Sequence, residues 1–250
     1  MNKLAKGILI GFVSILLVSC NSASPEDAKS LLAEIDTQAA PNTLSPTEEA
    51  AGWQLLFDGK STEGWHGYNM QSFPDCWAIE NGSLTMNSEG RGEDQDIITD
   101  KVYKNFALSL EYKLTEMSNS GIIFQVKEDT LYTYPYETGP EFQVIDHENW
   151  PDPLEDWQIN GANYAMYPPL VREFKPVGEW NHLFLVVSGN HVTQILNGTI
   201  VVEYEKYSDE WNRLKESGKW VNFPDWGKYD EGNISLHNHG TKVWDRSIKL

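Results

Sequence analysis

The sequence predicts an all-β fold, a sandwich or jelly roll of two antiparallel sheets with one or two short helices. Two Asn-Gly pairs, Asn81-Gly82 and Asn197-Gly198, lie between apolar runs and supply the left-handed residues of tight hairpin turns. From Phe106 to Leu114 apolar and polar residues alternate strictly, as in a strand with one face on the core. About ten short strands of this kind, with few helical stretches, fit a two-sheet architecture better than an α/β one.

The composition indicates one large globular domain and argues against two other classes. The chain has 250 residues, 40% of them hydrophobic, and it includes 10 Trp and 11 Tyr. This content of core-forming residues is too high for a disordered chain. The formal net charge of -18 argues against nucleic-acid binding, which needs clustered Lys and Arg.

The first 20 residues resemble a bacterial lipoprotein signal peptide. Two lysines precede an apolar run from Gly7 to Val18, which is too short to span a bilayer comfortably, and small residues then lead to Cys20. We therefore expect a lipidated Cys20 and a lipid-anchored protein of the bacterial cell envelope, either periplasmic or on the outer membrane. Residues 21–43 are expected to form a tether with one short amphipathic helix, and residues 44–250 a single domain.

A strand is predicted from Glu141 to Ile145, and one of its faces is unusually polar. Side chains alternate across a strand, so Glu141 and Gln143 share a face with Ile145, whereas Phe142 and Val144 face the core. Polar residues on a single strand could simply face water. The aromatic loop that precedes this strand carries Tyr132, Tyr134 and Tyr136 and could form one wall of a groove.

Two further strands carry polar groups that could join the same surface. From Ile122 to Lys127, an apolar face is expected to be backed by a polar face that includes Gln125. Near the C-terminus, His237 and His239 alternate with Leu236 and Asn238 and therefore share a face. If these strands lie beside Glu141, the carboxylate, Gln143, Gln125 and both imidazoles converge on one sheet surface.

Six motifs occur in a fixed order along the chain: Leu55-Leu56-Phe57-Asp58-Gly59-Lys60, Asn119-Ser120-Gly121-Ile122, Glu141-Phe142-Gln143-Val144-Ile145-Asp146, Lys175-Pro176-Val177-Gly178-Glu179-Trp180-Asn181, Leu196-Asn197-Gly198 and His239-Gly240. Together they resemble the 3-keto-disaccharide hydrolase family, over roughly residues 44–250. The resemblance implies a concanavalin-like jelly roll whose two curved antiparallel sheets hold carbohydrate. It also implies cleavage of glycosides already oxidised at sugar C3, by elimination between C1 and C2 and hydration, with net hydrolysis.

This reaction makes modest demands on a protein. A ketone at C3 acidifies the hydrogen at C2, so a base near C2, donors at the C3 oxygen and an acid for the leaving oxygen are sufficient. We expect Glu141 and His239 to move the protons. The sequence does not assign the role of base or of acid to either one. Gln143, Asn119 and His237 are expected to hold the sugar or polarise its ketone.

Four more residues are candidates for substrate binding, and three of them have a structural alternative. Gln125 belongs to the polar face already described, and Asp146 could instead cap the loop that follows it. Arg246 could pair with an acid on its sheet, and Trp180 could belong to the core rather than stack on a sugar. Asn119 could likewise be only a turn residue.

The expected cofactor requirements are small. A divalent metal held by Glu141 and His239 would polarise the ketone. No tight ligand spacing predicts a metal site, so whether the protein binds a metal stays an open question. No nicotinamide is expected, because no Gly-x-Gly-x-x-Gly follows a strand. A separate sugar 3-dehydrogenase would therefore supply the oxidised substrate.

Two other functions remain open at this stage. A non-catalytic carbohydrate-binding lipoprotein would need no acid and base. A conventional glycoside hydrolase similar to an endo-glucanase would need two facing carboxylates, and the strand from Glu141 offers only one on its face. The chain also departs from the family pattern, since His237 stands where relatives often have Gln, Gln125 where they have Arg, and Asp245 interrupts a Phe-Arg-Asn run.

Overall fold

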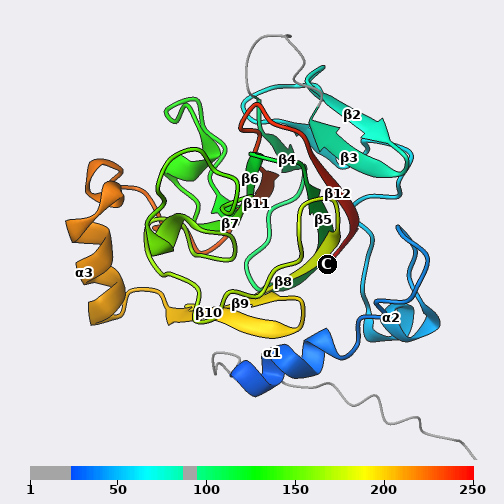
Figure 1. The fold of residues 1–250 in the computed structure, drawn as a ribbon, viewed down its shortest axis with the longest axis horizontal. Helices are drawn as coiled ribbons and strands as arrows, with labels where there is room; N and C mark the ends of the chain where they lie inside the picture. The colour runs from blue at the N-terminus through cyan, green and yellow to red at the C-terminus, as the bar shows by residue number, and fades with distance from the viewer. Residues whose placement is uncertain (1–23, 87–94) are drawn as a thin grey trace, which may run out of the picture.

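The computed structural model describes residues 24–86 and 95–250 and confirms the all-β jelly-roll class, with two antiparallel sheets packed face to face (Figure 1). The five-stranded sheet has the order β1 (Trp65–Gly67), β4 (Ile97–Thr99), β11 (Asn233–Leu236), β6 (Asn119–Val126), β7 (Glu141–Ile145). The seven-stranded sheet has the order β10 (Thr199–Glu205), β9 (His191–Leu196), β8 (Trp180–Ser188), β5 (Phe106–Leu114), β12 (Val243–Lys249), β3 (Ser83–Met86), β2 (Trp77–Glu80).

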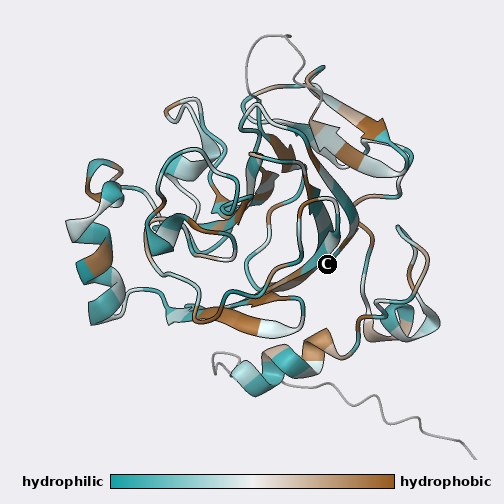
Figure 2. Cartoon of the chain, viewed as in Figure 1, coloured by the Kyte–Doolittle hydropathy of each residue, from teal (hydrophilic) through white to brown (hydrophobic). Residues whose placement is uncertain are grey.

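The alternation in the sequence determines which face of each strand is buried. On β5, the apolar residues from Phe106 to Leu114 lie in the core between the sheets. On β7, Phe142 and Val144 point into the same core, so Glu141 and Gln143 point away from it. Both Asn-Gly pairs adopt left-handed backbone conformations and close the β2–β3 and β9–β10 hairpins, as predicted. Figure 2 shows hydrophobic residues gathered mainly on the strands, while the loops and α3 are largely hydrophilic.

The alternation fails at one point on β6. Val126 pairs with Asn233 of β11, and Ile123 pairs with Ser235, so β6 has one residue more than its partner over this step. This is a β-bulge, and Gln125 within it has a left-handed backbone with φ of 53°. Val126 consequently clusters with Ile123, on the face opposite to the one that strict alternation assigns to it.

The segment before the domain is packed rather than a free tether. Helix α1 (Pro25–Leu32) buries Ala28 against Phe184 on the outer face of the seven-stranded sheet, and Figure 1 shows the helix beside β9 and β10. The Asn42 amide donates 2.7 Å to the Gly82 carbonyl. Helix α2 (Pro46–Ala51) then leads into the domain. The predicted signal segment and Cys20 lie outside the described residues.

The last helix, α3 (Asp209–Ser217), buries Trp211 in the main hydrophobic core cluster. Its N-cap is Ser208, whose hydroxyl accepts from the Trp211 backbone amide, and its C-cap is Gly218. The 3-10 turn η3 (Lys219–Asn222) follows directly. Two other such turns, η1 (Pro135–Glu137) and η2 (Asp156–Gln158), lie in the loops on either side of β7.

Candidate active site

The site forms on the outer face of the five-stranded sheet, where β11, β6 and β7 run side by side. Glu141 on β7 lies opposite Ile123 of β6, and Gln143 lies opposite Gly121. The His237 amide donates 2.9 Å to the carbonyl of Gly121, which continues the β11–β6 pairing by one residue. Gly121 therefore lies between the residues that carry the carboxylate and the imidazole.

Gly121 allows these two side chains to meet across the intervening strand. A Cβ atom at position 121 would overlap the Glu141 carboxylate, with its Cδ only 2.7 Å away. Without that Cβ, the carboxylate lies over β6 and reaches His237, where Glu141 Oε1 accepts from Nδ1 at 2.9 Å. Both side chains are largely buried. The absence of a side chain at one position thus creates an ion pair between residues 96 positions apart.

The imidazole of His237 is held in its charged form. Burial alone would lower its pKa, but the carboxylates of Asp96 and Glu141 and the hydrogen bond to Glu141 outweigh that effect and raise the pKa to about 9. At neutral pH the pair is therefore a carboxylate and an imidazolium. With Nδ1 bonded to Glu141, Nε2 is the ring nitrogen left to donate to a ligand.

A cavity of about 560 Å³ opens in front of this pair. Its lining includes His237, His239 and the loop residues Tyr134 and Tyr136. The two histidine rings lie 5.0 Å apart between centroids, and the two tyrosines stack at 5.1 Å. Asn238 lies between the histidines and is buried. Its backbone N–H donates to the Asp96 carboxylate at 2.6 Å, which fixes the segment that carries both imidazoles.

The structure therefore brings Glu141, His237 and His239 to one site, with Glu141 hydrogen-bonded to His237 rather than to His239. Asn119 lies on the same face, two residues before Gly121, and its buried Oδ1 has no hydrogen-bond partner among the described residues. Gln143 also belongs to this face, although its amide donates to the Gln158 carbonyl at 3.2 Å.

Gln125 does not join this surface, and the expectation that it would is wrong. The bulge on β6 redirects its side chain toward the buried ammonium of Lys206, which donates to Oε1 at 2.9 Å. The Gln125 amide donates to the Asp230 carbonyl at the same distance. Gln125 therefore accepts a hydrogen bond from a buried lysine and holds a loop.

Asp146 also has internal partners. Its carboxylate accepts from the Met117 amide at 2.8 Å and from the Asn149 side chain, and so joins two loops. This arrangement corresponds to the capping alternative rather than to a free substrate ligand.

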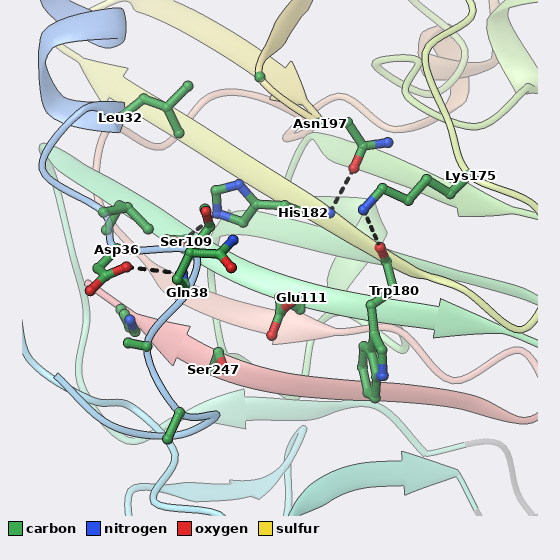
Figure 3. Close-up of a pocket in the computed structure, with 16 residues that line it drawn as sticks. Leu32, Asp36, Gln38, Ser109, Glu111, Lys175, Trp180, His182, Asn197 and Ser247 are labelled. Carbon is green, nitrogen blue, oxygen red and sulfur yellow. Dashed lines mark hydrogen bonds between the residues drawn. The ribbon is translucent and has the colours of Figure 1, made fainter. Parts of the chain in front are cut away.

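Trp180 and Arg246 lie on the other sheet, so they cannot share a site with Glu141. The core separates them from it, because β8 and β12 belong to the seven-stranded sheet and turn these side chains outward. Arg246 pairs with Glu111 at 2.9 Å, the structural alternative, and lies 3.8 Å from the centre of the Trp180 ring. Figure 3 shows Trp180 and Glu111 in a separate pocket of about 370 Å³ under the segment that follows α1.

Sequence reasoning missed three groups beside the pair. Asp96 acts on His237 from the turn before β4, and Tyr164 donates its backbone amide to the Glu141 carbonyl at 3.0 Å. Lys219 of η3 holds its ammonium 4.7 Å from the Tyr164 ring centre. None of these three residues belongs to a strand pattern, so side-chain alternation carries no signal for them. The sequence pointed only to the loop before Glu141, through its row of tyrosines.

Two features are absent from the part of the chain that the structure describes. Within residues 24–86 and 95–250, no group of three or more His, Cys, Asp or Glu side chains is arranged to hold a metal ion. No helix in these ranges is both long and apolar enough to cross a membrane.

Substitution of Gly121 tests the geometry of the pair. Gly121→Ala is expected to displace the Glu141 carboxylate, to break its bond to His237 and to destabilise the protein by about 1–3 kcal/mol, as overpacking does. Urea unfolding measures the loss. In the same background Glu141→Asp withdraws the carboxylate by one methylene and should restore most of the stability. Equal stability of Gly121→Ala and the parent protein would contradict the close approach.

Comparisons with known proteins identify the family of the chain. Residues 52–250 match the model of the 3-keto-alpha-glucoside-1,2-lyase-like domain. A 3-keto-disaccharide hydrolase of Bacteroides thetaiotaomicron is 31% identical, with 93% of this chain and 87% of the relative covered. A crystal structure from Parabacteroides distasonis, provisionally described as a glycosyl hydrolase, is 37% identical with a TM-score of 0.79, over 84% of this chain and 98% of that one.

A second structure from Parabacteroides distasonis, with the same provisional description, is 27% identical with a TM-score of 0.60, over 79% of this chain and 97% of the other. The family match covers most of the chain, and the curated relative aligns along nearly its whole length. The chain therefore belongs to the 3-keto-disaccharide hydrolase family, a family of carbohydrate-active hydrolases.

Proposed function

We propose that this protein cleaves 3-keto-glycosides by eliminating the C1 substituent and then adding water, with hydrolysis as the net result. The observation that carries this proposal is the buried Glu141–His237 pair beside His239 at the wall of the cavity. It combines a charged donor with a second imidazole, which are the groups that enolisation of a ketone needs. The name of the Bacteroides thetaiotaomicron relative supports the same substrate class.

The proposed roles follow from the partners of each group. His237, kept protonated by Glu141 and Asp96, donates from Nε2 to the C3 oxygen of the sugar. His239 is exposed at the cavity and takes the proton from C2. Glu141 is the positioning residue of the pair, since its carboxylate is occupied by His237.

The atoms balance without a redox step. The C2 proton passes to His239, a double bond forms between C1 and C2, and the C1–O bond breaks as the leaving oxygen takes that proton from His239, which regenerates the base. Water then adds across that double bond, with its hydroxyl at C1 and its proton at C2. The products are the released alcohol or sugar and a free 3-keto sugar.

Replacement of His239 tests the proposal. His239→Ala should lower kcat/KM for a 3-keto-glycoside by about 10²–10⁴-fold, the usual contribution of a general base. His191→Ala is the matched control, because His191 pairs with Glu203 at the opposite sheet and should leave turnover unchanged. Release of the aglycone is measured for the 3-keto-glycoside and for its unoxidised parent.

The same assay separates the alternatives. In D₂O, the proposed route incorporates deuterium at C2 of the product, whereas direct hydrolysis does not. Equal turnover of the oxidised and unoxidised glycosides would indicate a conventional glycoside hydrolase, and binding without turnover of either would indicate a carbohydrate-binding protein. Either result would overturn the proposal.

We also propose, from the sequence alone, that Cys20 carries a lipid anchor in the bacterial cell envelope and that a separate dehydrogenase oxidises the substrate at C3. Labelling of cells with a radioactive or alkyne fatty acid tests the anchor, and Cys20→Ser should abolish the label. Activity before and after treatment with EDTA tests whether a divalent metal contributes at Glu141 and His239.

A further inference from the structure

A lysine reaches the site from the element that follows α3. Lys219 is the first residue of η3, and the next residue, Trp220, is fully buried. Trp220 stacks on Trp226 at 4.5 Å, and Trp226 stacks on Trp211 of α3 at 5.6 Å. Three stacked indoles give η3 little freedom, so the position from which Lys219 extends is fixed.

Aromatic rings hold the ammonium of Lys219. It lies 4.8 Å from the ring centre of Tyr136, 4.7 Å from that of Tyr164 and 4.8 Å from that of Trp220. Distances of this size give a favourable cation–π attraction. Tyr136 lines the cavity, and its ring centre lies 6.2 Å from that of His237. The backbone N–H of Tyr164 donates to the backbone carbonyl of Glu141. The ammonium and the His237 ring therefore both lie against Tyr136, whose ring is part of the cavity wall.

The charges of the three groups influence one another. Partial burial lowers the pKa of the Lys219 ammonium, and the Glu141 carboxylate opposes that shift. The positive charge of Lys219 in turn lowers the pKa of His237. Within residues 24–86 and 95–250 the ammonium has neither a hydrogen bond nor an ion pair, so its three N–H donors are available to a ligand.

We propose that Lys219 binds the C3 oxygen of the substrate, together with His237, and stabilises the negative charge on that oxygen while the C2 proton leaves. This inference rests on the proposed function. As His239 takes the proton, the electron pair of the C2–H bond moves onto the C3 oxygen, where the ammonium lies. It then returns to form the C1–C2 double bond and expels the C1 substituent, so Lys219 makes no covalent bond.

Two substitutions of Lys219 separate charge from packing. Lys219→Met keeps the stem but removes the charge, and should lower kcat by about 10²–10³-fold with little change in KM, as the loss of one oxyanion donor does. Lys219→Arg keeps the charge and should stay within about tenfold of the parent protein. Lys228→Met is the matched control, because Lys228 pairs with Asp225 at the surface.

A second readout excludes a purely structural role. Deuterium exchange at C2 of a 3-keto sugar product in D₂O follows enolisation directly, and should fall in Lys219→Met by the same factor as kcat. Full turnover in Lys219→Met, or equal losses in Lys219→Met and Lys219→Arg, would overturn the role of Lys219 alone. If the parent protein turns over no 3-keto-glycoside, the proposed function fails and this inference fails with it.

Discussion

Glu141→Gln is expected to lower kcat/KM for a 3-keto-glycoside at pH 7–8 by about 10²–10³-fold, as the loss of one oxyanion donor does. The amide has nearly the shape of the carboxylate but no charge. One of the two carboxylates that hold the His237 proton is lost, so the pKa of His237 falls from about 9 toward its ordinary value. The imidazole then becomes neutral near pH 7 and polarises the ketone poorly.

The pH profile gives this prediction a specific signature. In the parent protein, activity that needs protonated His237 should fall as pH rises through about 9. In Glu141→Gln the same fall should occur at lower pH, and NMR titration of the His237 ring should show the same displacement. Glu111→Gln is the matched control, because Glu111 lies on the other sheet and pairs with Arg246. An unchanged profile in Glu141→Gln would refute the coupling of the pair.

Asp245→Asn is expected to stabilise the protein by about 2–3 kcal/mol more at pH 8 than at pH 5. Asp245 on β12 points into the core, with Tyr112 and Leu84 as its strand neighbours, and its Oδ2 has no hydrogen-bond partner among the described residues. Burial raises the pKa of this carboxyl to about 7. The folded state must therefore bury an unpaired charge whenever the solution is more alkaline than that.

The sign follows from proton binding in the two states. An unfolded Asp has a pKa of about 3.9. Between about pH 4 and 7 the folded state binds more protons than the unfolded state, so stability falls as pH rises through this window and stays low above it. Asparagine cannot ionise, so its advantage grows from about pH 4 and reaches its full size above about pH 7.

Urea unfolding at pH 5 and pH 8 measures this difference. Asp75→Asn serves as the matched control, because Asp75 is exposed and its replacement should change stability by less than about 0.5 kcal/mol at either pH. A gain for Asp245→Asn that is equal at both pH values would show that the charge of Asp245 is not its cause. A loss at pH 8 would show that the carboxylate is stabilised by its surroundings.

The fold was predictable because most of its determinants are local. The two Asn-Gly turns and the alternation along β5 each act within a few residues, and each occurs in the structure as expected. The prediction failed at Gln125, where a single extra residue in β6 reverses the alternation. A bulge of this kind depends on the partner strand β11, which lies more than 100 residues away in the sequence.

The sequence by itself determined the sandwich class, the family and the two faces of β7, with Glu141 opposite to the core. Only the tertiary structure decided that Glu141 bonds to His237, that Lys219 approaches them, and that Trp180 and Arg246 belong to another sheet. Side-chain alternation is a property of one strand, whereas the meeting of two strands depends on sheet order and on whether a residue such as Gly121 leaves space between them.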